Sequence, residues 1–226
     1  HTRLQGDWSS DVCSSDLVTV DAAFAPASGG GARQVWIIRH AQTEWSVNGR
    51  HTGRSDIPLT PAGIAAAEAL KPWMASTRFE RVLSSPLSRA IDTARLCGLE
   101  SQVQPEPLLM EWDYGDYEGI TTHAIRERAP DWDLWRDGCP GGETLAQVGA
   151  RAGTLLSKIE SISGNVALFS HGHFSRLIIS RWLRLPDSRG RSFAIRAGSV
   201  TVLGFEHENP VIWAAGDVPG TPGAGR

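Results

Sequence analysis

The sequence is poor in cysteine and contains no long apolar segment. None of its apolar runs approaches 18 residues, so no segment is long enough to span a bilayer as a helix. The three cysteines, Cys13, Cys97 and Cys139, have neither CxxC nor zinc-ligand spacing, and they are too few for a disulfide framework. We therefore expect no membrane partner, no structural zinc site and a reducing, cytoplasmic setting.

The sequence also has no large excess of positive or negative charge. Twenty-two Lys and Arg residues face 25 Asp and Glu residues, the formal net charge is −3, and no run of five like charges occurs. Nucleic-acid-binding proteins usually carry a basic patch, so we expect no nucleic-acid partner. Neither a GxxxxGK[ST] nor a GxGxxG motif is present, which argues against a nucleotide-binding loop. The oligomeric state stays open.

The 226 residues, of which 41% are hydrophobic, suffice for one globular domain with a full core. Residues 1–17 show no helix or strand periodicity, and DWSSDVCSSDL within them resembles the translation of a common sequencing adapter. We expect this segment to be non-native. Residues 18–32, which end in a glycine-rich stretch, are expected to be a flexible lead-in, residues 33–215 the domain, and residues 216–226 a flexible tail.

Strand and helix patterns alternate along residues 33–215. Strands are expected at 35–38, 81–83, 166–169, 200–205 and 211–214. Helices are expected at 61–74, where Pro72 predicts an early end or a kink, from Ser85 as cap to Cys97 with Gly98 closing it, at 143–162 and at 174–183. The alternation predicts an α/β three-layer sandwich, in which helices cover both faces of a mostly parallel sheet.

Polar residues follow three of the expected strands, at Arg39-His40, Ser84-Ser85 and Ser170-His171. Open α/β sheets bind ligands at the carboxyl ends of their strands. One histidine in such a place is more often structural than functional, but two at separate strand ends favour a shared site. Together with Arg39 and Arg89, they could form a pocket for a phosphate dianion.

Four ordered motifs carry a resemblance to the histidine phosphatase superfamily, whose fold is phosphoglycerate-mutase-like. They are Arg39-His40-Ala41-Gln42-Thr43, Ser85-Pro86-Leu87-Ser88-Arg89-Ala90, Glu111 in EWDYGDYEG, and Ser170-His171-Gly172-His173. The resemblance covers about residues 33–215. Ala41 stands where the family signature has glycine, which requires an unstrained backbone at that position.

The resemblance implies that His40 is a nucleophile that becomes phosphorylated and that Glu111 is the proton donor. Arg39, Arg89 and His171 would hold the phosphoryl oxygens, so neither a metal nor a cofactor is implied. Arg39 beside His40 should lower the pKa of that histidine. The alternative for Glu111 is a solvated loop carboxylate. The other acidic residues of its motif, Asp113, Asp116 and Glu118, are interpreted as structural.

Further stretches resemble the branch that contains sedoheptulose-bisphosphatase. By this resemblance, the substrate-binding candidates are Ser46, His51, Thr52, Tyr114 and Arg176. Arg176 matches a position that binds the far phosphate of a bisphosphate, and its alternative is an exposed helix cation. His51 and Tyr114 could contact sugar hydroxyls.

The resemblance implies a metal-independent phosphomonoesterase that acts through a phosphohistidine on a small sugar phosphate or bisphosphate. Two alternatives remain. A cofactor-dependent phosphoglycerate mutase is disfavoured by the short separation of Glu111 and His171, and a non-catalytic phosphate-binding module is disfavoured because every expected catalytic residue is present.

Overall fold

The structure is a computed structural model that describes residues 33–218. The expectations for residues 1–17 and 18–32, and for all but the first three residues of the predicted tail, lie outside the described residues. Of those three, Gly216 and Asp217 belong to the last strand. Within the described range, no helix is both long and apolar enough to cross a bilayer.

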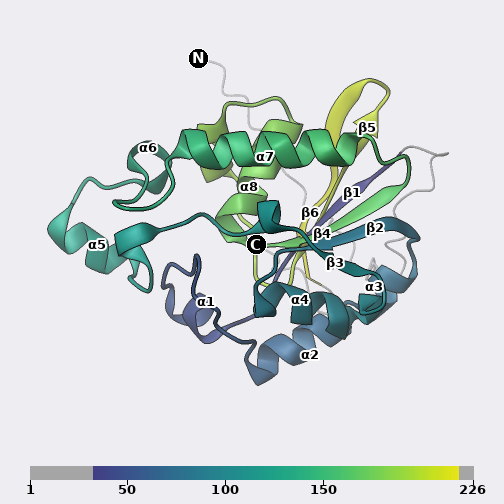
Figure 1. The fold of residues 1–226 in the computed structure, drawn as a ribbon, viewed down its shortest axis with the longest axis horizontal. Helices are drawn as coiled ribbons and strands as arrows, with labels where there is room; N and C mark the ends of the chain where they lie inside the picture. Colours follow the sequence, from purple (N-terminus) through teal and green to yellow (C-terminus); the bar gives the residue numbers. More distant parts are fainter. Residues whose placement is uncertain (1–32, 219–226) are drawn as a thin grey trace, which may run out of the picture.

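A single six-stranded sheet forms the centre of the fold (Figure 1). Its strands are β1 (Val35–Arg39), β2 (Phe79–Ser84), β3 (Val103–Pro105), β4 (Asn165–Ser170), β5 (Val200–Glu206) and β6 (Asn209–Asp217), in the order β3-β2-β4-β1-β5-β6. The first four strands run parallel, whereas β5 and β6 add antiparallel strands at one edge. The prediction of a mostly parallel sheet is confirmed.

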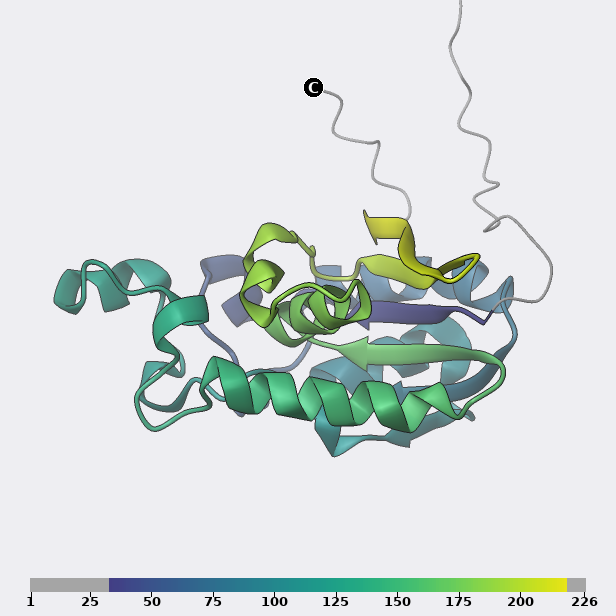
Figure 2. The same ribbon diagram turned by 90° about the horizontal axis from the view of Figure 1, so that it is seen from above.

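Helices cover both faces of this sheet (Figures 1 and 2). Side chains alternate along β1, so Val35 and Ile37 enter one hydrophobic core while Trp36 and Ile38 enter the other. The first core is covered by α7 (Leu145–Glu160) and α8 (Gly172–Trp182). The second is covered by α2 (Pro61–Ala69), α3 (Lys71–Ala75) and α4 (Ser88–Ala94). The three-layer prediction is confirmed.

Several helix boundaries differ from the predicted ones. The helix expected from Ser85 begins only at Ser88, because Ser85 hydrogen-bonds to His171 instead of capping the helix. Gly98, with φ of +92°, breaks the helical backbone that continues from α4 through Arg95 to Cys97, so the run ends there as predicted. The helix expected at 143–162 is shorter, since a capping box starts it after Thr144. The first helix ends at Ala69, before Pro72, as predicted.

Short elements that the pattern did not predict lie near the carboxyl end of the sheet. They include α1 (Glu44–Asn48), α5 (Thr122–Arg128) and α6 (Leu134–Asp137). Each spans seven residues or fewer, too few for a helical periodicity to appear. Together with the loop after α1, α1 and α5 supply part of the rim of the cavity described below.

Candidate active site

The carboxyl ends of β1 and β4 bring His40 and His171 together. The two strands are neighbours in the sheet, with Arg39 opposite Ser170, so the residues that follow them lie side by side. The ring centroids of His40 and His171 are 5.2 Å apart. Residues far apart in the sequence thus form one cluster, because parallel strands end at the same edge.

His40 is held as a neutral imidazole with one free nitrogen. Its Nδ1 lies 2.8 Å from the Ala41 carbonyl oxygen, which can only accept, so Nδ1 carries the hydrogen and Nε2 keeps its lone pair. Burial lowers the pKa of His40 well below its usual value, and the charges of Arg89 and then Arg39 lower it further. Arg39 was expected to cause this shift, whereas burial contributes most.

The backbone after His40 does not require glycine. Ala41 is fully buried. Within residues 33–218, only Arg184 and His207 among non-glycine residues have a positive φ. The methyl group of Ala41 is therefore accommodated without backbone strain.

His171 and Arg89 form a fully buried pair beside His40. The Arg89 Nε–H donates to His171 Nδ1 at 3.2 Å, so the neutral His171 ring carries its hydrogen on Nε2 and donates it to Ser85 Oγ at 2.8 Å. Both Nη atoms of Arg89 donate to carbonyl oxygens of residues 52, 53 and 55. Burial, Arg89 and His40 lower the pKa of His171 well below its usual value.

Arg39 has a buried donor that no acceptor satisfies. Its Nη1 donates to the Ile195 carbonyl at 2.6 Å, but its Nε has no hydrogen-bond partner in residues 33–218. The guanidinium lies against Gly172, where a Cβ atom would be 3.3 Å from Arg39 Cζ. Glycine therefore leaves room for the guanidinium, and the Arg39 side chain lines the cavity described below.

Glu111 caps the amino end of α8. Its Oε1 accepts from the backbone N–H groups of Trp112 (2.9 Å) and Phe174 (2.8 Å), and its Oε2 accepts from that of His173 (3.0 Å). The side chain is only 4% exposed. Glu111 is therefore not a solvated loop carboxylate.

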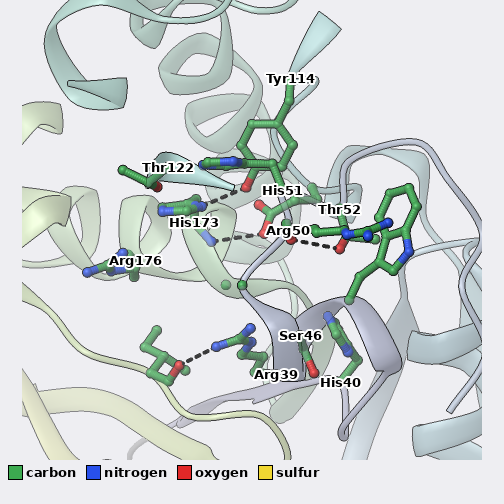
Figure 3. Close-up of a pocket in the computed structure, with 15 residues that line it drawn as sticks. Arg39, His40, Ser46, Arg50, His51, Thr52, Tyr114, Thr122, His173 and Arg176 are labelled. Atoms are coloured by element: carbon green, nitrogen blue, oxygen red, sulfur yellow. Dashed lines mark hydrogen bonds between the residues drawn. The ribbon is translucent and has the colours of Figure 1, made fainter. Parts of the chain in front are cut away.

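These groups open into a cavity of about 210 Å³ (Figure 3). Its lining residues are Arg39, His40, Trp45, Ser46, Gly49, Arg50, His51, Thr52, Glu111, Tyr114, Thr122, Gly172, His173, Arg176 and Ile195. Eight of them were predicted as site residues. Arg89 and His171 do not line the cavity but lie buried behind its wall.

The sequence analysis missed several lining residues, among them His173. His173 belongs to the Ser170-His171-Gly172-His173 motif, but a sequence motif does not show which of two histidines faces a cavity. Trp45 and Arg50 lie in stretches that carry the resemblance but were not among the predicted site residues, whereas Thr122 and Ile195 come from segments that carried no signal.

The hydroxyl groups of Ser46 and Thr52 are already engaged within the protein. Ser46 Oγ donates to the Thr43 carbonyl at 2.8 Å and accepts from the Thr43 N–H, which forms the capping box of α1. Thr52 Oγ1 donates to the Arg50 carbonyl at 3.2 Å. Both residues line the cavity, but their hydroxyl hydrogens are committed to backbone oxygens.

Arg176 is half-buried and lines the cavity, so it is not the exposed helix cation of the alternative interpretation. Its Nε donates to the Phe193 carbonyl, its Nη2 donates to the Arg191 carbonyl at 3.4 Å, and its guanidinium lies 5.6 Å from the Trp135 ring centroid. Its Nη1 makes no hydrogen bond to the described part of the chain.

The other acidic residues of the Glu111 motif support loops. Both carboxylate oxygens of Glu118 accept from the Gly53 N–H, and one also accepts from the Ser55 N–H, which holds the loop whose carbonyls bind Arg89. Asp113 pairs with Arg54 at 3.3 Å. Across residues 33–218, no group of three His, Cys, Asp or Glu side chains is arranged to hold a metal ion.

Two known proteins and one solved structure resemble this chain over most of its described length. An acid phosphatase of Mycobacterium tuberculosis is 45% identical over 175 residues, which cover 76% of this chain and 86% of that protein. Sedoheptulose 1,7-bisphosphatase of Saccharomyces cerevisiae is 32% identical over 181 residues, which cover 66% of this chain and 67% of that protein. The solved structure of the protein from an open reading frame of Mycobacterium tuberculosis superimposes on this chain with a TM-score of 0.79 at 41% identity. The match covers 83% of this chain and 98% of that chain.

A family model agrees with these relatives. The model of the histidine phosphatase superfamily (branch 1) matches residues 35–217, which include every strand of the sheet and all the residues that line the cavity. The chain therefore belongs to the histidine phosphatase superfamily.

Proposed function

We propose that the chain is a phosphomonoesterase that passes a phosphoryl group from a small hydroxylated ester to His40 and then to water. The observation that carries this proposal is the state of His40: a neutral ring, buried at a strand end, with Nε2 free while Nδ1 is bound to the Ala41 carbonyl. The relatives named acid phosphatase and sedoheptulose 1,7-bisphosphatase support the same class of reaction.

In the first step, the Nε2 lone pair of His40 attacks phosphorus. A P–N bond forms as the P–O ester bond breaks, and the leaving alkoxide takes a proton from Glu111. Oε2 of Glu111 is the oxygen suited to carry that proton, because it accepts only one backbone N–H whereas Oε1 accepts two. General acid catalysis of this kind typically contributes about 10²–10⁴ in rate.

In the second step, water attacks the phosphohistidine. Glu111, now a carboxylate, takes a proton from the water as the P–O bond forms and the P–N bond breaks. Inorganic phosphate leaves, and His40 returns to its neutral form with Nε2 free. Each proton lost by Glu111 in the first step is thus regained in the second.

The positive charges around His40 stabilise the phosphoryl group in both steps. Arg39, which lines the cavity next to His40, places its guanidinium charge beside the phosphoryl oxygens. Arg89 adds its charge from behind the wall. A hydrogen bond from His171 Nε2–H to a phosphoryl oxygen would replace the one that it now donates to Ser85 Oγ.

The dimensions of the cavity suit a small substrate. A volume of about 210 Å³ lies below the usual range for drug-sized ligands, which favours a small alcohol portion beside the phosphoryl group. Arg176 could hold the far phosphate of a sugar bisphosphate through its Nη1. The free thiols of Cys97 and Cys139 are compatible with a reducing compartment, and we place the reaction in the cytoplasm.

Trapping the intermediate tests the proposal. Incubation with labelled phosphate ester followed by alkaline quench should leave label on the protein, because phosphohistidine is labile to acid. His40→Ala should abolish both label and phosphate release. The matched control is His123→Ala, whose side chain is 88% exposed on α5. Equal labelling of the His40 variant and the wild type would refute the assignment, and release of inorganic phosphate separates hydrolysis from mutase action.

A further inference from the structure

A second pair of histidines, His51 and His173, lines the cavity apart from His40 (Figure 3). His51 comes from the loop after α1, and His173 lies at the start of α8. Their rings are nearly parallel, with an interplanar angle of 16° and centroids 6.3 Å apart. The reaction steps above use neither ring.

The hydrogen bond of His51 determines which of its nitrogens can bind a ligand. Nδ1 lies 2.7 Å from the Ile120 carbonyl oxygen, which can only accept, so Nδ1 carries the ring hydrogen. Burial lowers the pKa of His51, which keeps the ring neutral. Its Nε2 is therefore a hydrogen-bond acceptor, and it makes no hydrogen bond to the described part of the chain.

His173 has the opposite arrangement. The Tyr114 hydroxyl lies 2.6 Å from His173 Nδ1, and Tyr114 is only 2% exposed. This hydroxyl has no other hydrogen-bond partner within residues 33–218, and burial raises the pKa of Tyr114 well above its usual value, so it donates its hydrogen to Nδ1. The hydrogen of the neutral His173 ring is therefore on Nε2, a free donor.

We propose that His51 and His173 recognise the hydroxyl groups of the substrate's alcohol portion, with His51 Nε2 as acceptor and His173 Nε2–H as donor. Tyr114 is the positioning residue that holds the donor on His173. A hydroxyl group both donates and accepts, so adjacent hydroxyls of a polyol satisfy this pair. The inference rests on the proposed phosphatase function and assigns a substrate class to the same cavity.

The neutral rings of His51 and His173 favour hydroxyl groups over a second phosphate at this part of the cavity. A phosphate dianion can only accept hydrogen bonds, and the lone pair on His51 Nε2 repels it. Burial lowers the pKa of His173 well below its usual value, and Arg176, His51 and Arg39 lower it further, so the ring offers no positive charge. Tyr114 was expected to contact the sugar itself, but its hydroxyl is engaged with His173, which makes the contact in its place.

The test compares two esters whose three-carbon chains differ only in two hydroxyl groups, glycerol 3-phosphate and n-propyl phosphate. The measured quantity is the ratio of their kcat/KM values, which does not depend on the folded fraction of a variant because both rates come from the same sample. In His51→Asn and His173→Asn the amide can retain the bond made by Nδ1, while the far side of the ring, which carries Nε2, is removed. His173→Gln restores an N–H near the position of Nε2.

We expect His51→Asn, His173→Asn and Tyr114→Phe each to lower the ratio about three- to tenfold, the effect of one neutral hydrogen bond. His173→Gln should recover most of the loss. Tyr117→Phe is the matched control, because it removes the same atom from the only other tyrosine, whose ring packs on Trp132 outside the cavity lining.

An unchanged ratio in both asparagine variants would overturn the inference, and so would a parallel fall in the rates for both esters. In either case the two rings only shape the wall, and the proposed phosphatase function stands. If wild-type protein releases no phosphate in a His40-dependent manner from any ester, the proposed function fails and takes the inference with it. The two failures are therefore distinguishable.

Discussion

Replacing Glu111 with glutamine separates the two roles that the structure assigns to this side chain, as cap of α8 and as proposed proton donor. The glutamine oxygen can take the place of Oε1 and keep the bonds from Trp112 and Phe174. Its NH₂ group then faces the His173 N–H, so one of three bonds is lost and two donors meet. We expect a loss of about 1–3 kcal/mol in the free energy of unfolding, measured by urea titration.

The catalytic effect should depend on the leaving group. Hydrolysis of a sugar phosphate should slow by about 10²–10⁴, because the alkoxide needs a proton as it leaves. Hydrolysis of p-nitrophenyl phosphate should slow much less, since p-nitrophenolate leaves without one. The assay is kcat for both substrates on the same preparation.

Glu106→Gln is the matched control for stability. Glu106 is also 4% exposed, accepts from the backbone N–H of Leu108 at the start of a short helix and pairs with Lys158, but it does not line the cavity. The Glu106→Gln variant should be less stable to urea than the wild type but should hydrolyse both the sugar phosphate and p-nitrophenyl phosphate at unchanged rates. Equal slowing of both substrates by Glu111→Gln would refute the proton-donor reasoning and leave Glu111 as a cap that orients α8.

Three further outcomes are expected. Arg176→Ala should raise KM for a sugar bisphosphate by a factor corresponding to about 1.5–3 kcal/mol and barely affect p-nitrophenyl phosphate; an equal rise for both would assign Arg176 to the fold. EDTA should leave the rate unchanged because Arg39 and Arg89 supply the positive field, and loss of activity with rescue by magnesium would contradict this. The melting temperature should fall as the pH drops below about 6.5. The reason is that His40, His171 and His173 have lowered pKa values in the folded state, so the unfolded chain takes up protons more readily. A rise in melting temperature between about pH 7 and pH 5 would contradict this.

Local pattern was enough to predict the layers of the fold and the edge where the site lies. The apolar run at 35–38 is buried on both sides of the sheet, as its continuous hydrophobicity indicates. His40 and His171 directly follow parallel strands, and strand direction alone brings them to one edge. Short elements such as α1 and α6 escaped prediction, because a helix of five residues or fewer shows no periodicity.

Only the tertiary structure decided what each site residue does with its hydrogen bonds. Glu111 caps a helix that begins 61 residues later, a relation that the helix's own sequence does not carry. Sequence also could not distinguish His173, which faces the cavity, from His171, which lies behind its wall. The protonated nitrogen of each ring depends on a partner in another segment: Ile120 for His51, Tyr114 for His173. Residue types and strand ends are encoded locally, whereas the choice of donor and acceptor is made where distant segments pack.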